Sequence, residues 1–471
     1  MKFLYEPRQL HRMDETLISG GSDIELFPHR VPGSIAGIGG PKSRPLQVVF
    51  VTIADLPEGG GNTTRVKMLA NAVAGRGHQV YLLNEHSLGI TPRELLKATG
   101  QIGSVEYRYV LGSIERQFGL RSITTKLRAV LALLQAIARR HSRKRIDVLW
   151  LNNLSFYDMW PLTKLAQRLG IRTVQSYEDE RLELIAPQQS LSGGLLALNG
   201  RLADRSCPHR ADAIVVISHY LKEKYLSRAA GKTPVHLIPT IVDCNYWAVG
   251  PEPVTDLPTL LYAGCFGEQD EMENLLGALA MLRDQGRGFR AVFLGANRDA
   301  DRVARVASDI RVRGLNTVIE MKGFVPLDQV KSHIANANVM LNIRRDGLWS
   351  RSGLSTKLSE YLASGRVVVT TALGDVVRYV EHGKSAILVP PSTTVPQIAA
   401  AIDQALVSPQ LRDRIGCGGR EVARTHFDLR AVGRKLEFVL DTVMRFHPSG
   451  ADASVENHLL NRSDVMESRI L

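Results

Sequence analysis

The stretch that decides the fold runs from Met340 to Pro391 and reads MLNIRRDGLWSRSGLSTKLSEYLASGRVVVTTALGDVVRYVEHGKSAILVPP. An apolar segment, 339–343, ends at two arginines and is followed by a polar loop with two glycines. Apolar residues at helical spacing then precede Gly365, which suits a left-handed helix cap. The run 367–371 is continuously apolar or β-branched, as expected of a strand buried on both faces of a parallel sheet. The stretch therefore predicts a strand–helix–strand unit of an α/β domain.

The start of the predicted helix has the residue types that would hold a sugar nucleotide. Ser355 or Thr356 stands at the N-cap position, and basic residues flank it. Free backbone N–H groups at a helix N-terminus favour a phosphate. Glu360 lies further along the helix, where a carboxylate can accept hydrogen bonds from sugar hydroxyls. We therefore expect a donor site at this helix.

These residues resemble the donor-binding core of retaining, GT-B-type glycosyltransferases of the group 1 kind. The family has a Glu, seven residues and a second Glu; here Ser352 stands in the first place and Glu360 in the second. Ser-Thr-Lys357-Leu-Ser-Glu-Tyr resembles a sub-branch with Pro-x-Lys-Leu-x-Glu-Tyr. The resemblance runs from about residue 46 to about residue 440. It implies an α/β fold of two Rossmann-like, doubly wound domains that face each other across a cleft.

A glycine-rich loop follows the first predicted strand, 46–53, and precedes a helix, 63–74. It contains Gly59, Gly60, Gly61 and Asn62. Such a loop lies at the edge where open α/β sheets bind ligands, and glycine lets a backbone approach a ligand closely. The resemblance implies a place near the acceptor and the donor phosphates; a bare tight turn is the alternative. The loop lacks G-x-G-x-x-G, which argues against a nicotinamide dinucleotide.

An acidic cluster follows the predicted strand 172–176. Glu178 and Asp179 come directly after this strand, at the edge that faces the cleft of a doubly wound domain. They could hydrogen-bond acceptor hydroxyls, and Asp179 could accept a proton. The alternative is a helix N-cap with favourable first-turn acids.

The resemblance implies further donor contacts in the second domain. The segment from Gly264 to Gly267 resembles the phosphate loop of the family, but Cys265 and Asp270 stand where basic residues are usual. The turn Gly323, Phe324, Val325 matches the one whose backbone contacts the nucleotide base.

Glycosyl transfer places extra negative charge on the departing phosphate, so cations near it lower the barrier. The candidates are Arg344, Arg345, Arg351 and Lys357. No metal-ligand pattern such as Asp-x-Asp stands in a convincing loop, so we expect no metal and no cofactor besides the nucleoside-diphosphate sugar.

The chain has 471 residues and a net charge of +12, which favours anionic partners. Residues 121–145 carry eight Lys or Arg and no Asp or Glu, with apolar residues at helical spacing. This basic amphipathic helix could dock on an anionic membrane and reach a lipid-linked acceptor. It could equally cover the sheet with a solvated basic face. Without an aromatic-studded basic surface or a known motif, we expect no nucleic-acid partner.

Compartment and domain limits follow from the rest of the sequence. Four cysteines lie far apart without CxxC, which suits a reducing compartment. No apolar stretch reaches the length of a spanning helix, and residues 1–30 lack a signal-peptide core. We expect a cytoplasmic protein, peripheral at the inner face of the membrane.

The expected parts are a flexible arm (1–45), an acceptor-side domain (46–248), a nucleotide-sugar domain (249–428), a return helix (429–446) and a mobile tail (447–471).

The expected activity is transfer of a sugar from a nucleoside-diphosphate sugar to a glycan or lipid-linked acceptor, with retention. Two alternatives stay open. A catalytically degenerate relative acting as a partner or regulator would explain Ser352 and Cys265. A sugar-nucleotide epimerase could use the same fold.

Overall fold

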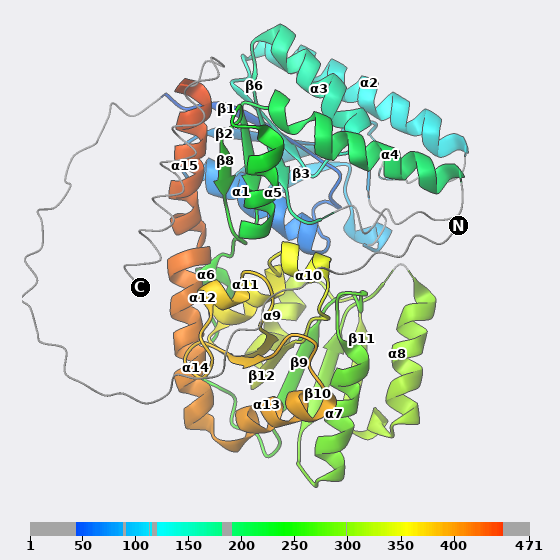
Figure 1. Cartoon of the computed structure of the whole chain (residues 1–471), viewed down its shortest axis with the longest axis vertical. Helices are drawn as coiled ribbons and strands as arrows, with labels where there is room; N and C mark the ends of the chain where they lie inside the picture. Colours follow the sequence, from blue (N-terminus) through cyan, green and yellow to red (C-terminus); the bar gives the residue numbers. More distant parts are fainter. Residues whose placement is uncertain are drawn as a thin grey trace, which may run out of the picture. The chain divides into compact units, whose positions relative to one another are not determined.

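The computed structural model describes residues 44–87, 91–112, 114, 120–180, 191–297 and 299–445. The predicted tail, and all but the last two residues of the predicted arm, lie outside these ranges. Within the described residues the strands form two sheets, one of eight strands and one of six (Figure 1). This arrangement confirms the predicted fold class of two Rossmann-like α/β domains.

The N-terminal sheet has the strand order β3-β4-β2-β1-β5-β6-β7-β8. Its strands are β1 (Gln47–Thr52), β2 (Gln79–Asn84), β3 (Thr99–Ile102), β4 (Val105–Tyr109), β5 (Val148–Asn152), β6 (Arg172–Tyr177), β7 (Ala213–Val216) and β8 (Val235–Leu237). All neighbours are parallel except β3, which runs antiparallel to β4 at the edge. The chain moves outward in both directions from β1, so the carboxyl ends of β1 and β5 border a switch point where such sheets bind ligands.

Helices cover both faces of this sheet. They are α1 (Gly61–Ala74), α2 (Leu120–Arg143), α3 (Phe156–Leu169), α4 (Leu191–Ser206), α5 (His219–Ala229) and α6 (Cys244–Trp247). Two short 3-10 helices, η1 (Arg93–Leu95) and η2 (Pro208–Arg210), lie in connections. The buried residues of α1 pack with one face of β1, and those of α2 and α3 pack with the opposite face.

The C-terminal sheet is entirely parallel, with the order β11-β10-β9-β12-β13-β14. Its strands are β9 (Thr259–Ala263), β10 (Arg290–Leu294), β11 (Ile319–Gly323), β12 (Val339–Asn342), β13 (Val367–Thr371) and β14 (Ile387–Val389). Every residue of β13 is buried, as predicted for a strand covered on both faces. The switch point of this sheet lies between β9 and β12.

The helices of this half are α7 (Met272–Asp284), α8 (Ala300–Val312), α9 (Leu327–Ala335), α10 (Leu348–Ser352), α11 (Thr356–Ser364), α12 (Val376–Tyr379), α13 (Val395–Val407) and α14 (Pro409–Val422). The 3-10 helix η3 (Leu315–Thr317) precedes β11. Gly365 ends α11 in the left-handed region at φ +77°, as predicted.

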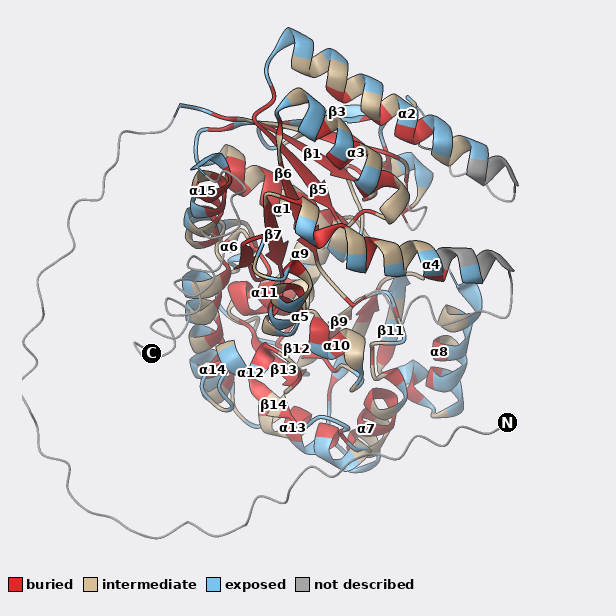
Figure 2. Ribbon diagram, turned by 45° about the horizontal axis from the view of Figure 1, so that its top comes forward, coloured by how far each residue is buried: buried red, intermediate tan, exposed pale blue. Residues whose placement is uncertain are grey.

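The last helix, α15 (Leu429–Arg445), follows a π-helical turn, η4 (Ala423–Phe427), and packs against α1, β6 and β7 (Figure 1). Its inward residues Val432, Leu436 and Val439 join the core of the N-terminal sheet. Another hydrophobic core contains residues of both sheets, such as Val49 and Met340. Figure 2 shows the central strands of both sheets as buried and the outer sides of the helices as exposed.

Candidate functional site

Two helix N-termini meet where the sequence predicted a phosphate. Helix α1 begins after Gly60 and α11 begins after Ser355, and neither cap residue hydrogen-bonds its helix through a side chain. A Cβ placed on Gly61 would lie 3.2 Å from Thr356 Oγ1. The structure therefore brings the glycine loop 59–62 and the predicted donor helix together. Both N-termini present partial positive charge to the same space.

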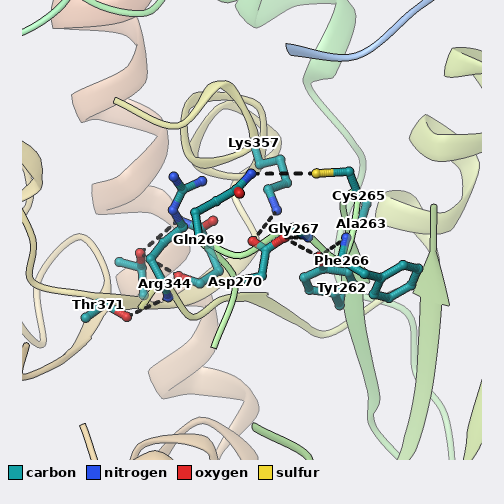
Figure 3. Close-up of polar contacts among 12 residues, drawn as sticks. Tyr262, Ala263, Cys265, Phe266, Gly267, Gln269, Asp270, Arg344, Lys357 and Thr371 are labelled. Carbon is teal, nitrogen blue, oxygen red and sulfur yellow. Dashed lines mark hydrogen bonds and ion pairs between the residues drawn. The ribbon is translucent and has the colours of Figure 1, made fainter. Parts of the chain in front are cut away.

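The loop after β9 is built around the carboxylate of Asp270 (Figure 3). This side chain is buried and accepts hydrogen bonds from the Tyr262 hydroxyl (2.9 Å) and the Gly267 backbone N–H (3.0 Å). Lys357 Nζ lies 3.2 Å from its other oxygen. Burial alone would raise the pKa of Asp270, but Lys357, Arg344 and the hydrogen bonds hold it below the ordinary value. The carboxylate is therefore ionised and orients Lys357.

Lys357 projects from the first turn of α11 against the backbone of this loop. A Cβ on Gly264 would lie 2.6 Å from Lys357 Nζ, so the loop approaches the ammonium this closely only with glycine there. The ammonium also lies 4.8 Å from the centre of the Tyr262 ring. Helix α11 thus places a basic group against this loop, although Cys265 and Asp270 occupy the two loop positions where basic residues are usual.

The predicted cations differ in their environment. Arg345 pairs with Glu271 (3.2 Å), and the exposed Arg351 makes a two-bonded pair with Asp346 (2.6 and 2.8 Å). The guanidinium of Arg344 makes no hydrogen bond or ion pair with the part of the chain that is described, while its backbone N–H donates to Thr371 Oγ1 (2.9 Å). Neighbouring carboxylates thus pair with Arg345 and Arg351 but not with Arg344, and the role of all three arginines at the phosphate stays a prediction.

Glu360 lies one turn beyond Thr356, on α11. Its side chain is only partly exposed, and burial raises its pKa to about 8 against the effect of Lys357 and Lys67. Lys67 belongs to α1 and also faces Glu58 (3.9 Å). No residue within the described ranges forms a hydrogen bond with the Glu360 carboxyl, so both oxygens are available to a ligand.

The turn predicted to contact the nucleotide base begins at Gly323, at the carboxyl end of β11 and beside the loop after β9. The backbone N–H of Gly264 donates to Leu294 O (2.9 Å), and that of Gly295 donates to Gly323 O (2.6 Å). These bonds link the loops after β9, β10 and β11. Gly323 adopts φ +66°, and the next two residues, Phe324 and Val325, are half-buried.

The acidic cluster lies at the carboxyl end of β6, as predicted. Asp179 Oδ2 accepts a hydrogen bond from Trp349 Nε1 (3.3 Å), while Oδ1 is buried without a hydrogen-bond partner in the described structure. Glu178 lies 3.8 Å from Nε of the buried Arg65, whose pKa is lowered to about 10 by burial. Residues 181–190, which follow these acids, lie outside the described ranges, so the capping alternative stays open.

Ser352, which stands in the place of the family's first Glu, is fully buried. Its Oγ accepts from the Glu180 backbone N–H (3.1 Å), and its carbonyl accepts from Ser218 Oγ. His219 Nδ1 lies 2.9 Å from Asp375 Oδ2 nearby. Sequence reasoning missed these contacts and the role of Tyr262, because serine and tyrosine carry no distinctive spacing signal.

A pocket of about 540 Å³ adjoins the loop after β9. Its lining includes Phe266, Gly267, Arg302, Arg345 and Trp349. The pocket thus extends from the loop that holds Lys357 towards Trp349, the residue that contacts Asp179. No group of three or more His, Cys, Asp or Glu side chains that could hold a metal occurs in the described ranges.

Two family models match the chain in order. Residues 59–246 match Glycosyltransferase Family 4, and residues 257–408 match Glycosyl transferases group 1. The alpha-D-kanosaminyltransferase of Streptomyces kanamyceticus is 27% identical over 38% of this chain and 45% of its own length. The GDP-mannose-dependent alpha-(1-6)-phosphatidylinositol monomannoside mannosyltransferase of Mycolicibacterium smegmatis is 25% identical over 51% of this chain and 65% of its own length. The chain thus spans less than two thirds of either relative.

Among solved structures, Anabaena HepE in complex with UDP-glucose superposes with a TM-score of 0.61 at 15% identity. The superposition covers 84% of this chain and all of HepE. The matched models fall on the two Rossmann-like domains, and the matched relatives are glycosyltransferases. The chain therefore has the fold of GT-B glycosyltransferases, and each of its two domains is similar in sequence to glycosyltransferases.

Proposed function

We propose that the protein transfers a glycosyl unit from a nucleoside-diphosphate sugar to an acceptor hydroxyl with retention of anomeric configuration. The observation that supports this most is the meeting of two helix N-termini without side-chain caps, α1 and α11, beside the Lys357 ammonium. Backbone N–H groups, two helix dipoles and a cation in one place suit a diphosphate.

In the proposed reaction the acceptor oxygen bonds the anomeric carbon as the bond from that carbon to the β-phosphate oxygen breaks. Negative charge then grows on the diphosphate, and Lys357 and Arg344 stabilise it. Glu360 accepts hydrogen bonds from the ribose hydroxyls. We propose that the turn from Gly323 holds the base and that no further cofactor takes part.

We assign the acceptor hydroxyl to Asp179, which takes its proton as the new bond forms. One oxygen of Asp179 is held by Trp349 Nε1, and the other is buried without a hydrogen-bond partner in the described residues. A carboxylate held in this way can accept a hydroxyl proton. We further propose a glycan or lipid-linked acceptor, in line with the phosphatidylinositol mannoside named for one relative.

A second candidate is a degenerate protein that binds the nucleotide without turnover. Two observations favour it: Ser352 is buried where the family has a Glu, and Asp270 neutralises part of the charge on Lys357. The proposed transferase differs in releasing the diphosphate only when an acceptor is present.

A panel of nucleotide sugars, incubated with the protein and with membrane lipid extracts or glycans, tests the function. Transfer of labelled sugar, with the donor's anomeric configuration in the product, is the expected result. Binding without product would favour the degenerate protein. Conversion of the donor sugar without an acceptor would favour an epimerase and contradict the proposal.

A further inference from the structure

Helices α2, α3 and α4 expose an unusual combination of side chains. Four large apolar residues are exposed on them: Leu127 (62%), Leu131 (58%), Trp160 (44%) and Leu198 (51%). The exposed charged side chains described on the three helices are all basic, and include Arg128, Lys164, Arg168, Arg201 and Arg205. The three helices contain two acids, Asp158 and Asp204, and both are buried.

The three helices are neighbours, and contacts between them link the segments that carry the exposed apolar residues. The Lys126 ammonium of α2 lies 5.3 Å from the centre of the Tyr157 ring of α3, and the Tyr157 backbone N–H donates to Asn199 Oδ1 of α4 (3.2 Å). Leu127 and Leu198 are adjacent in sequence to two of these contact residues. Trp160 lies one helical turn beyond Tyr157. We call the surface formed by Leu127, Leu131, Trp160, Leu198 and the surrounding arginines the three-helix face.

The three-helix face lies towards the catalytic edge of the sheet. Helix α2 ends before β5 begins, so its N-terminal half lies towards the carboxyl ends of the strands. Helix α3 begins at the carboxyl end of β5. The exposed Leu127 and Trp160 occur in the N-terminal halves of these helices. Asp179 follows β6 at the same edge.

We propose that the three-helix face docks on an anionic lipid bilayer, with Trp160 and the leucines entering the headgroup region. Apolar side chains with interspersed arginines and no exposed acid match a negatively charged interface in both charge and polarity. The sequence predicted membrane docking for the basic helix 121–145 alone; the proposal extends this role to a surface formed by three helices. No helix in the described ranges is both long and apolar enough to cross a bilayer.

Binding to vesicles tests the docking directly. The full chain is sedimented with phosphatidylcholine vesicles and with vesicles that also contain phosphatidylglycerol. The protein binds the acidic vesicles and is released by salt, because screening weakens exposed charges. Leu127→Glu with Arg128→Glu weakens this binding about tenfold or more, since each basic group near the surface contributes roughly 1 kcal/mol.

The chain offers a matched control on α8, in the other domain. Arg311 and Val312 are also adjacent and exposed, so Arg311→Glu with Val312→Glu introduces the same change in charge. The control variant keeps wild-type vesicle binding. Equal loss in both variants would show a net-charge effect and overturn the proposal. Absence of wild-type binding to acidic vesicles would overturn it as well.

Two further measurements distinguish docking on a bilayer from other uses of the three-helix face. Trp160→Phe removes most of the fluorescence quenching that brominated lipid causes; unchanged quenching contradicts insertion at Trp160. If the Leu127 and Arg128 double variant dissociates a dimer but binds vesicles normally, the face is an interface between copies of the chain and the proposal fails.

The consequence for the substrate rests on the proposed function. A bilayer on the three-helix face lies at the edge that carries Asp179, which suits a lipid-linked acceptor. Transfer to a lipid acceptor in acidic vesicles falls in the Leu127 and Arg128 double variant, while transfer to a soluble glycan acceptor does not. Vesicle binding without any transfer would reject the proposed function and leave the docking intact.

Discussion

Lys357 Nζ lies 3.2 Å from Asp270 Oδ1, and this ion pair joins the first turn of α11 to the loop after β9. The acid stands where the family usually has a cation, and it holds a cation that comes from another element. Because Asp270 is also fixed by Tyr262 and Gly267, it positions the Lys357 ammonium against the loop backbone. The ion pair thus places a cation from the helix at this loop.

Lys357→Met should destabilise the protein by about 2–3 kcal/mol, because it leaves the buried Asp270 without its nearest cation. Urea unfolding monitored by circular dichroism measures this change. The double variant Lys357→Met with Asp270→Asn should recover most of the loss. A double variant as unstable as the single one would show that the pair does not couple the two elements.

Gly264→Ala should weaken nucleoside-diphosphate binding about fivefold to tenfold, because the added Cβ meets the Tyr262 hydroxyl and the Lys357 ammonium. Gly347→Ala is the matched control, since a Cβ there meets no atom within 4 Å. Calorimetric titration of both variants compares them. Equal affinities would mean that Lys357 does not contact the diphosphate.

The ionisation of Glu360 should appear in the pH dependence of stability. Its pKa is raised from 4.5 to about 8 in the folded protein, so this group favours folding most below pH 4.5, and the contribution is lost as pH rises towards 8. Glu360→Gln should therefore gain about 1–3 kcal/mol over wild type between roughly pH 5 and pH 8, allowing for partial exposure. Unfolding measured across this range checks the difference. A difference independent of pH would contradict the shifted pKa.

The fold was largely predictable because its signals are local and repeated. Continuous apolar strands such as 367–371 and the cap at Gly365 follow from burial and backbone conformation. The edge strand β3, in which three of the four residues are exposed, was not predicted, since it lacks the apolar run of a buried strand. Helices α8 and α14 were missed as well.

The candidate site was predictable in its position but less so in its contacts. Sequence order placed Gly61, Lys357 and Glu360 at the carboxyl ends of strands, and the structure brings the first two regions together. The pairing of Arg345 with Glu271 and of Lys357 with Asp270 depends on how separate loops fold against each other. No spacing in the sequence reports such long-range pairs.

Asp179→Asn should lower the rate of sugar transfer about tenfold or more while leaving the affinity for the nucleoside diphosphate unchanged. The reason is that the proposed reaction assigns the acceptor hydroxyl to Asp179, which has a buried carboxylate oxygen, and the diphosphate to the N-termini of α1 and α11. Steady-state kinetics together with a titration of the free diphosphate separate the two effects. Full activity in this variant would remove Asp179 from the reaction.

The most direct test of the central claim is a calorimetric titration of UDP and GDP into the wild-type protein, Arg344→Ala and Arg345→Ala. The two arginines are neighbours, but Arg345 is paired with Glu271 and the Arg344 guanidinium makes no such pair among the described residues. The account predicts that wild type binds a nucleoside diphosphate, that Arg344→Ala binds it about tenfold or more weakly, and that Arg345→Ala binds it like wild type. No binding to wild type, or equal losses in both variants, would contradict a diphosphate site between α1 and α11.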